Sequence, residues 1–223
     1  GPTTTPVTMV DVMVVYTSAA KAGAGGDAAM RALIGLAMAE ANTVYQNSRA
    51  NVRLRLVNQQ EMQYAEAPTF SINLNRLRGT NDGFFDEVHA LRETNRADLV
   101  CLITEEGDAG FGGLAFTMTE PLPEFRAFGF SVVRRSEAVG SFNFCHEVTH
   151  NFGCQHDREH AFDATGAPLA GVFHYSYGYR FSAEGIIYRT VMAYEPGEIV
   201  PFLSTPGISF KGTPMGVPDS LTN

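Results

Sequence analysis

Residues 145–157 read Cys-His-Glu-Val-Thr-His-Asn-Phe-Gly-Cys-Gln-His-Asp, and their spacing points to a metal site. His146 and His150 are four residues apart, so a helix would place both imidazoles on one face. Glu147 follows the first of them, which puts its carboxylate beside an ion held by the pair, where it can take a proton from a water. Gly153 tolerates the positive φ that lets a chain leave a helix sharply, and the turn carries His156 back. Three imidazoles with an open fourth position predict a catalytic zinc site rather than a closed structural one.

The same residues resemble a known group of enzymes. His-Glu-x-x-His-x-x-Gly-x-x-His is the metzincin signature. Asp157, directly after the third histidine, resembles the adamalysin/reprolysin branch, and residues 190–194, Thr-Val-Met-Ala-Tyr, resemble the metzincin methionine turn. Tyr194, two residues after Met192, instead resembles astacins and serralysins. The chain is most similar to bacterial reprolysin-like peptidases, and weaker matches at residues 14–17 and 97–100 point the same way.

This resemblance implies a secreted zinc-dependent endopeptidase. It implies that zinc is held by three ligands, His146, His150 and His156, and that Glu147 is the general base. It assigns structural roles to Gly153, Asp157 and Met192. For Tyr194 two roles stay open: its hydroxyl reaches the zinc or stabilises the oxyanion, or it packs on a backbone carbonyl. A zinc-binding recognition module that cleaves nothing and a hydrolase of non-peptide amides are the alternatives, although the presence of Glu147 argues against the first.

Two segments are candidates for contact with a substrate. In metzincins an extended peptide pairs with an exposed strand above the zinc, and residues 113–118 are the candidate for that strand. The residues expected to bind there are Gly113, Leu114, Ala115 and Phe116. The segment Val200-Pro201-Phe202 resembles the wall of the specificity pocket that follows the methionine turn. An ordinary edge strand and a core strand are the respective alternatives.

The bulk composition fits one globular catalytic domain. The chain has 223 residues, of which 44% are hydrophobic and 18% charged, and we expect a single domain over residues 1–223 with an upper lobe (1–153) and a lower lobe (154–223). A formal charge of −8 argues against a nucleic-acid partner. No apolar run is long enough to span a membrane. We expect a monomer that acts on protein or peptide substrates, and whose precursor carries an inhibitory propeptide that has been removed.

The order of expected elements is typical of an α/β fold. Strands are expected at 7–16, 52–57, 99–103, 114–118 and 127–133. Helices are expected from Asp27 to about residue 45, from Asp82 to about residue 91, and from about Ser141 through the histidines. Residues 61–81 are expected to be irregular. Strand–helix–strand units favour a parallel sheet, and the resemblance implies a twisted, mostly parallel five-stranded sheet with two long helices, the zinc helix and a small irregular C-terminal lobe.

The cysteines and one acidic loop give weaker indications. The chain has three cysteines, which are too few for a disulfide scaffold. Cys145 and Cys154 would be about 13 Å apart along a helix, too far for a bond. Free buried thiols are expected, with a Cys101–Cys145 bond as the alternative. A calcium ion at Glu105, Glu106 and Asp108 is a further possibility, weaker than a solvated loop.

Overall fold

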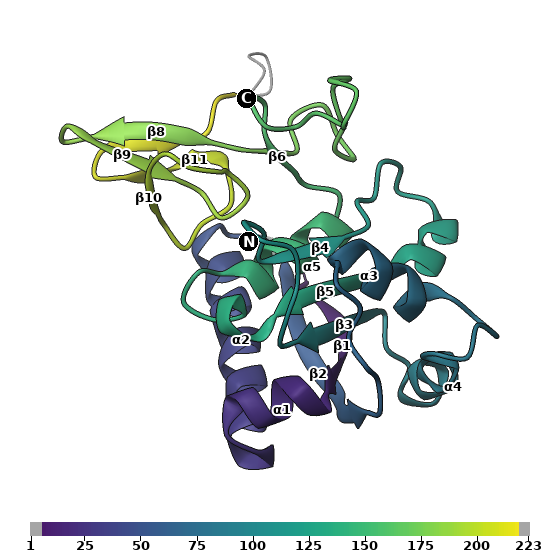
Figure 1. Ribbon diagram of the computed structural model, residues 1–223. Coiled ribbons are helices and arrows are strands. Elements are labelled where there is room, and N and C mark those ends of the chain that lie inside the picture. Colours follow the sequence, from purple (N-terminus) through teal and green to yellow (C-terminus); the bar gives the residue numbers. More distant parts are fainter. Residues whose placement is uncertain (1–5, 219–223) are drawn as a thin grey trace.

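A computed structural model of the chain describes residues 6–218. Its centre is a five-stranded sheet in the order β2-β1-β3-β5-β4 (Figure 1). Neighbouring strands are parallel except at the edge, where β4 runs antiparallel to β5. The expected mostly parallel α/β fold is therefore confirmed. The strands are β1 (Thr8–Thr17), β2 (Val52–Met62), β3 (Leu99–Thr104), β4 (Gly113–Ala115) and β5 (Phe130–Arg134).

Helices cover both faces of this sheet. Val12 and Val14 of β1 face a core shared with α2 and α5, whereas Met13 and Val15 face a second core shared with α3 and α4. This alternation follows from the period of two residues in a strand. It explains why residues 12–16 of β1 are all apolar, since both faces of the strand are covered there. The helices are α1 (Ser18–Ala24), α2 (Asp27–Asn47), α3 (Phe70–Arg78), α4 (Asp86–Asn95) and α5 (Asn143–Asn151).

Helix α1 was not expected, and the other helices differ from expectation in three places. Only α2 is long, at 21 residues, whereas α4 has 10. Helix α4 begins at Asp86 rather than near Asp82, because the Asp86 carboxylate accepts the Asp82 and Gly83 amides, both at 3.1 Å, in a preceding turn. Helix α3 lies in the stretch expected to be irregular. Three of its four apolar residues recur at helical spacing and pack on the sheet, and they are Phe70, Leu74 and Leu77.

The edge strand β4 is shorter than predicted. It covers Gly113–Ala115 instead of continuing to Met118. The Met118 amide donates to the carbonyl of His150 at 3.2 Å, and Asn151 Nδ2 donates to the Phe116 carbonyl at 2.8 Å. These bonds draw the chain from the sheet toward α5, so the strand ends early. Two 3₁₀ helices, η1 (Pro123–Phe128) and η2 (Arg135–Glu137), flank β5.

The chain after Gly153 forms small sheets on one side of the five-stranded sheet (Figure 1). Two of these sheets, those of residues 180–199 and 205–215, share a core that contains Phe181, Tyr188, Val200 and Met215. Strands β6 and β7 pair with each other, β8, β9 and β10 form a second sheet, and β11 and β12 a third. They are β6 (Gln155–Asp157), β7 (Tyr177–Gly178), β8 (Arg180–Ala183), β9 (Ile186–Arg189), β10 (Glu198–Ile199), β11 (Thr205–Phe210) and β12 (Thr213–Met215).

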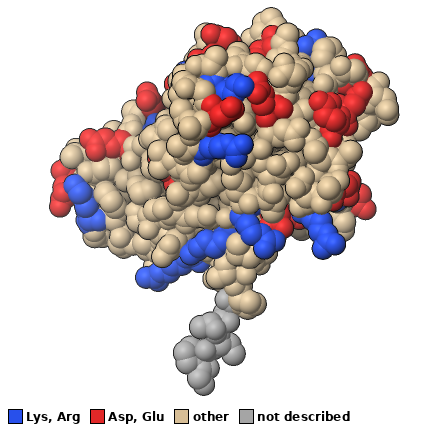
Figure 2. Space-filling model, turned by 90° about the horizontal axis from the view of Figure 1, so that it is seen from below, with Lys and Arg blue, Asp and Glu red and all other residues tan. Residues whose placement is uncertain are grey.

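The surface carries both signs of charge. Figure 2 shows acidic and basic side chains interspersed on the face seen from below. None of the helices described between residues 6 and 218 is long and apolar enough to cross a membrane. The three cysteines are free thiols, as expected, and Cys101 and Cys145 are buried. Burial raises the pKa of each of these two thiols to about 12.

Candidate functional site

Helix α5 and the turn after it bring three imidazoles together. His146 and His150 lie one turn apart on α5, and both are buried. The helix ends at Asn151, Gly153 follows with φ 89°, and β6 then presents His156. A Cβ atom on Gly153 would lie 2.4 Å from Val172 Cβ, so the site needs glycine for space as well as for φ. The Nε2 atom of His150 lies 3.1 Å from that of His146 and 3.1 Å from that of His156.

The opposite ring nitrogens show which atoms carry protons. His146 Nδ1 lies 2.9 Å from the Val191 carbonyl, and His150 Nδ1 lies 2.7 Å from the Cys154 carbonyl. A carbonyl only accepts, so both Nδ1 atoms must donate, which leaves a lone pair on each Nε2. Burial lowers the pKa of His146 to about 4 and that of His156 to about 3. The pKa of His150 also falls well below its usual value, first through burial and then through the neighbouring histidines.

This donor set fits a metal ion. Three neutral imidazoles that direct lone pairs at one another repel unless a cation lies between them. Three nitrogen ligands with no fourth protein ligand match the donor set of catalytic zinc. In the described part of the chain these histidines are the only group of three or more potential ligands close enough to hold a metal ion. The carbonyl bonds at Nδ1 would orient the rings for it.

Glu147 lies beside the histidines and against the edge of the sheet. Its side chain is buried, and burial raises its pKa to about 8. A Cβ atom on Gly113 of β4 would lie 2.7 Å from Glu147 Cγ and 2.6 Å from the Val132 carbonyl. Gly113 therefore lets the carboxyl group approach the strand edge closely. A carboxyl group with a pKa near neutrality is suited to accept and return a proton.

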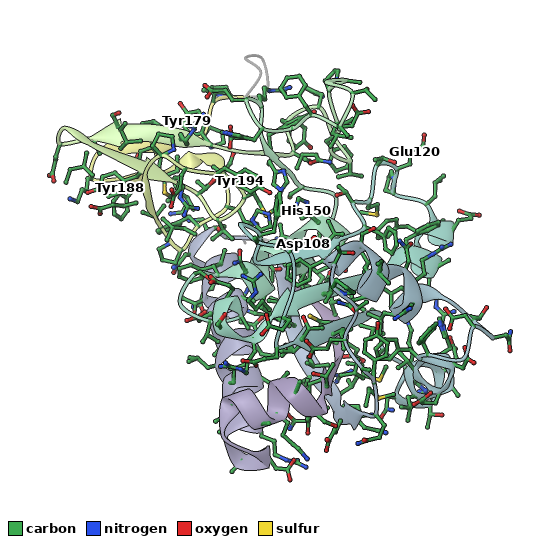
Figure 3. All side chains as sticks on the ribbon, in the orientation of Figure 1. Asp108, Glu120, His150, Tyr179, Tyr188 and Tyr194 are labelled. Carbon is green, nitrogen blue, oxygen red and sulfur yellow. The ribbon has the colours of Figure 1, made fainter. Side chains whose placement is uncertain are left out.

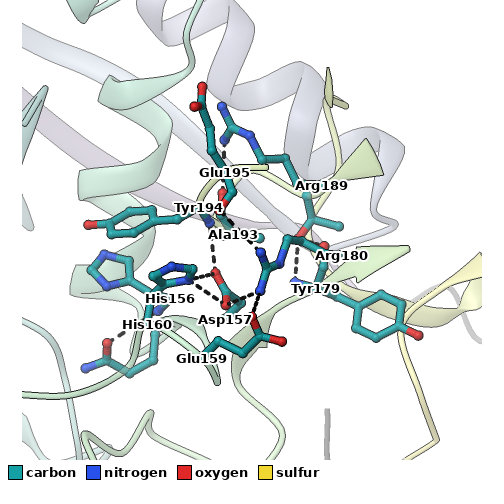
Figure 4. Close-up of polar contacts among 12 residues, drawn as sticks. His156, Asp157, Glu159, His160, Tyr179, Arg180, Arg189, Ala193, Tyr194 and Glu195 are labelled. Carbon is teal, nitrogen blue, oxygen red and sulfur yellow. Dashed lines mark hydrogen bonds and ion pairs between the residues drawn. The ribbon is translucent and has the colours of Figure 1, made fainter. Parts of the chain in front are cut away.

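Asp157 connects His156 with the segment around Met192. Figure 4 shows its carboxylate among His160, Arg180 and the backbone of Tyr194. It accepts the Tyr194 amide at 2.9 Å and His160 Nδ1 at 2.8 Å, and Arg180 Nη2 lies 3.4 Å away. The side chain is only 6% exposed, so this carboxylate is buried but well supplied with donors. It joins β6, β8 and the turn after β9.

The turn at residues 190–194 lies directly against the histidines. Met192 is buried, and a Cβ atom on Gly178 of β7 would lie 2.5 Å from the backbone of this turn. The Tyr194 ring lies 4.1 Å from that of His156, measured between centroids. Figure 3 shows Tyr194 and His150 near one another, above the five-stranded sheet. Burial raises the pKa of Tyr194 to about 12. Within residues 6–218, no hydrogen bond joins its hydroxyl to another residue.

A cavity of about 680 Å³ opens beside the imidazoles. Residues 110–113 form one rim, and the segment from Arg189 to Glu195 contributes to the other. His146, Glu147 and Tyr194 line it between these rims. The cavity thus lies between the free edge of β4 and the turn at residues 190–194, which is where an extended chain could be held.

Some residues expected at the site lie elsewhere. Val200 is buried in the core of the small sheets, Phe202 packs against that core, and Pro201 accepts a bond from Asn47 Nδ2 at 3.1 Å. None of the three lines the cavity, so their role as a pocket wall stays a prediction. Two of the three acidic residues considered for calcium have other partners, since Glu105 pairs with Arg135 and Asp108 accepts the Phe70 amide.

Comparison with known proteins agrees with this geometry. A family profile described as metallo-peptidase family M12B, reprolysin-like, matches residues 5–215. The chain belongs to the reprolysin-like M12B metallopeptidase family. A protein named peptidyl-Asp metalloendopeptidase from Stenotrophomonas maltophilia (strain R551-3) is 35% identical over 98% of this chain and 50% of its own. One of the same name from Xanthomonas campestris pv. campestris is 35% identical over 96% and 48%.

More distant relatives share the fold or the name. A peptidyl-Asp metalloendopeptidase from Pseudomonas aeruginosa is 32% identical over 83% of this chain and 32% of its own length. A chain from a solved chaperone–substrate complex matches with a TM-score of 0.72 and 18% identity, over 96% of this chain and 33% of that one. The latter likeness concerns the fold alone. This reprolysin-like chain spans about half the length of the first two relatives.

Sequence reasoning missed several residues of the site. His160 lies three positions after Asp157, a spacing that could have marked it as a partner of that carboxylate. Arg180 gave no such signal, because its approach to Asp157 depends on how β8 packs. Arg189 and Arg134 both line the cavity, and only the position of Arg189 three residues before Met192 connects it with a known motif.

Proposed function

We propose that this chain is a zinc-dependent endopeptidase that cleaves protein chains next to aspartate. The observation that supports it most is the set of three Nε2 atoms, 3.1 Å apart between neighbours, with the Glu147 carboxyl group beside them in the same cavity. The preference for aspartate is suggested by the name of the relatives, peptidyl-Asp metalloendopeptidase. Secretion and a removed inhibitory propeptide, which the family resemblance implies, belong to the same proposal.

His146, His150 and His156 would hold the ion, with Nδ1–H bonds to carbonyls keeping the first two rings in place. When bound, zinc supplies a water of lowered pKa and polarises the scissile carbonyl. Glu147 accepts the proton of the attacking water and passes it to the leaving amine. Its contact with Gly113 keeps it next to a substrate held on β4. No covalent intermediate with the protein is required.

The free edge of β4 would bind the substrate backbone. The Gly112 carbonyl accepts the Arg134 amide at 2.8 Å, and the Phe116 amide donates to the Phe130 carbonyl at 3.4 Å. Because polar backbone groups alternate in direction along an antiparallel strand, Gly113 and Ala115 direct theirs to the outer edge. A peptide can add there as a further strand. Ala115→Pro removes one outward donor and should therefore raise KM.

Tyr194 would assist at the oxyanion. Its hydroxyl has no bond to another described residue, and its ring packs on His156 at the edge of the cavity. A hydroxyl donor at that place can stabilise the charge that develops on the carbonyl oxygen. The fixed backbone position, set by the bond from its amide to Asp157, would help aim it.

One experiment separates this function from its alternatives. The purified chain should hydrolyse casein and an aspartate-containing peptide, lose activity with a zinc chelator, and regain it with zinc. Glu147→Gln should bind zinc and unfold at the parent temperature, yet lose about 10²–10⁴-fold in kcat. Zinc binding without hydrolysis by the parent would instead indicate a recognition module. Cleavage confined to small non-peptide amides would instead indicate an amide hydrolase that does not act on peptides.

A further inference from the structure

The cavity beside the histidines contains an arginine whose only acidic neighbour of electrostatic effect among the described residues is the exposed Glu195, with which it forms no ion pair. Arg189 ends β9 and is half-buried, and no carboxylate in the described part of the chain lies within ion-pair distance of it. A partly buried cation is costly unless a counter-charge meets it. We propose that Arg189 determines specificity, pairing through its guanidinium group with the aspartate carboxylate next to the cleaved bond. This inference rests on the proposed function and deepens it.

The guanidinium group is held rigidly with donors to spare. Its Nε atom donates to the Gly197 carbonyl at 3.0 Å. Its Nη1 atom donates to the Ala193 carbonyl at 2.9 Å (Figure 4). These bonds use two of five N–H groups and attach the side chain to the loop that contains Tyr194. Arginine presents the remaining donors as a planar fork, which matches the two oxygens of a carboxylate. A preset fork loses less side-chain freedom on binding than a mobile cation would.

Its position suits a side chain next to the cleaved bond. Arg189 lines the same cavity as Glu147 and His146. Its positive charge is close enough to His146 to lower the pKa of that imidazole, a smaller effect than burial. An aspartate carboxylate has a short stem, so its receptor must lie near the reacting carbonyl. Arg189 meets this requirement on the side of the cavity formed by the segment after β9.

The other charges in the cavity are less suited to the role. Arg134 donates to the Asp108 carbonyl at 2.6 Å, and its guanidinium carbon lies 5.6 Å from the centre of the Phe70 ring. Glu195 is exposed and raises the pKa of Arg189, but burial lowers that pKa more strongly. Glu137 also lines the cavity. A bound aspartate on the Tyr194 side of the cavity would thus meet the Arg189 fork, whereas Arg134 lies on the side of Gly112 and β4.

The test compares two peptides that differ only in Asp against Asn, an uncharged isostere. For each variant the ratio of the two kcat/KM values is measured, together with zinc content and thermal unfolding. Arg189→Gln should lower the Asp/Asn ratio about 10- to 100-fold, because a hydrogen-bonded charge pair is lost; any loss from its bonds to the Tyr194 loop affects both peptides and cancels in the ratio. Arg189→Lys keeps the charge without the fork and should give an intermediate ratio. Arg134→Gln, the matched control from the same cavity, should keep the parent ratio.

A binding measurement keeps the inference separate from catalysis. Fluorescence anisotropy measures the binding of both labelled peptides without turnover. The two proteins compared are zinc-loaded Glu147→Gln and the double variant that also carries Arg189→Gln. Preference for the Asp peptide that depends on Arg189 would support the inference even if the parent cleaved nothing, which would defeat only the proposed function. The inference would be overturned if the Asp/Asn ratio stayed unchanged in Arg189→Gln. It would also be overturned if the preference for Asp were lost in Arg134→Gln instead. If Arg189→Gln fails to fold, the Asp/Asn ratio of Arg189→Lys is used instead. A ratio equal to that of the parent would then refute recognition by the guanidinium fork.

Discussion

The buried carboxylate of Asp157 should be a major source of stability at the site. Asp157→Ala removes the acceptor of two good hydrogen bonds, from the Tyr194 amide at 2.9 Å and His160 Nδ1 at 2.8 Å. It also leaves Arg180, whose side chain is 17% exposed, without its buried partner. Hydrogen bonds to a charged group contribute about 1.5–3 kcal/mol each. Removing one member of a buried ion pair costs about 3–5 kcal/mol.

We therefore expect Asp157→Ala to lower the free energy of unfolding by about 4 kcal/mol, a large part of the roughly 5–15 kcal/mol typical of a domain. At about 2–4 °C per kcal/mol for a chain of this size, the melting temperature should fall by about 8–16 °C. The 3.4 Å contact between Arg180 Nη2 and Asp157 is long for a hydrogen bond, so it contributes to this free energy only as an electrostatic attraction.

The assay is urea unfolding followed by circular dichroism, on metal-free protein so that zinc does not contribute. Glu159→Ala is the matched control, because Glu159 contacts the same Arg180 with a side chain that is 77% exposed. An exposed pair contributes at most about 1 kcal/mol. A loss below about 1 kcal/mol in Asp157→Ala would refute the reasoning, since the carboxylate would then not hold the turn.

Three further outcomes are expected. Tyr194→Phe should reduce kcat about 10²–10³-fold with little change in KM or zinc content; a destabilised variant with unchanged kcat would favour a packing role. Gly113→Ala places a Cβ atom 2.7 Å from Glu147 Cγ, so steady-state assays should show a fall in kcat while zinc is retained. A kcat equal to that of the parent would contradict the close approach. For metal-free protein, the pKa values of His146 (about 4) and His156 (about 3) lie below the 6.5 of an unfolded chain. Between the folded and the unfolded pKa the unfolded state therefore binds more protons, so stability should fall as pH drops from about 6.5 to 4. A urea midpoint that does not change over this pH range would contradict this expectation.

Local spacing was enough to predict much of the molecule. The β1–α2–β2 unit and the buried strand β3 follow from periods of two and 3.6 residues, which any chain segment carries within itself. The convergence of His146 and His150 follows equally from one helical turn. The turn after the helix follows from the glycine at position 153, which tolerates the positive φ that the structure shows there. Helix α3 was missed because a few apolar residues among polar ones give a weak local signal, although the three that face the sheet suffice once the sheet offers a surface.

What the sequence by itself determined is the metal-binding motif and the order of strands and helices. The tertiary structure alone decided which distant residues surround that motif. Gly113 meets Glu147, Arg180 meets Asp157, and Arg189 enters the cavity of His146 only because elements distant in the sequence pack together. It also placed Val200 in a core rather than at the cavity. These contacts join segments tens of residues apart, and their formation depends on packing that no local pattern of residues encodes.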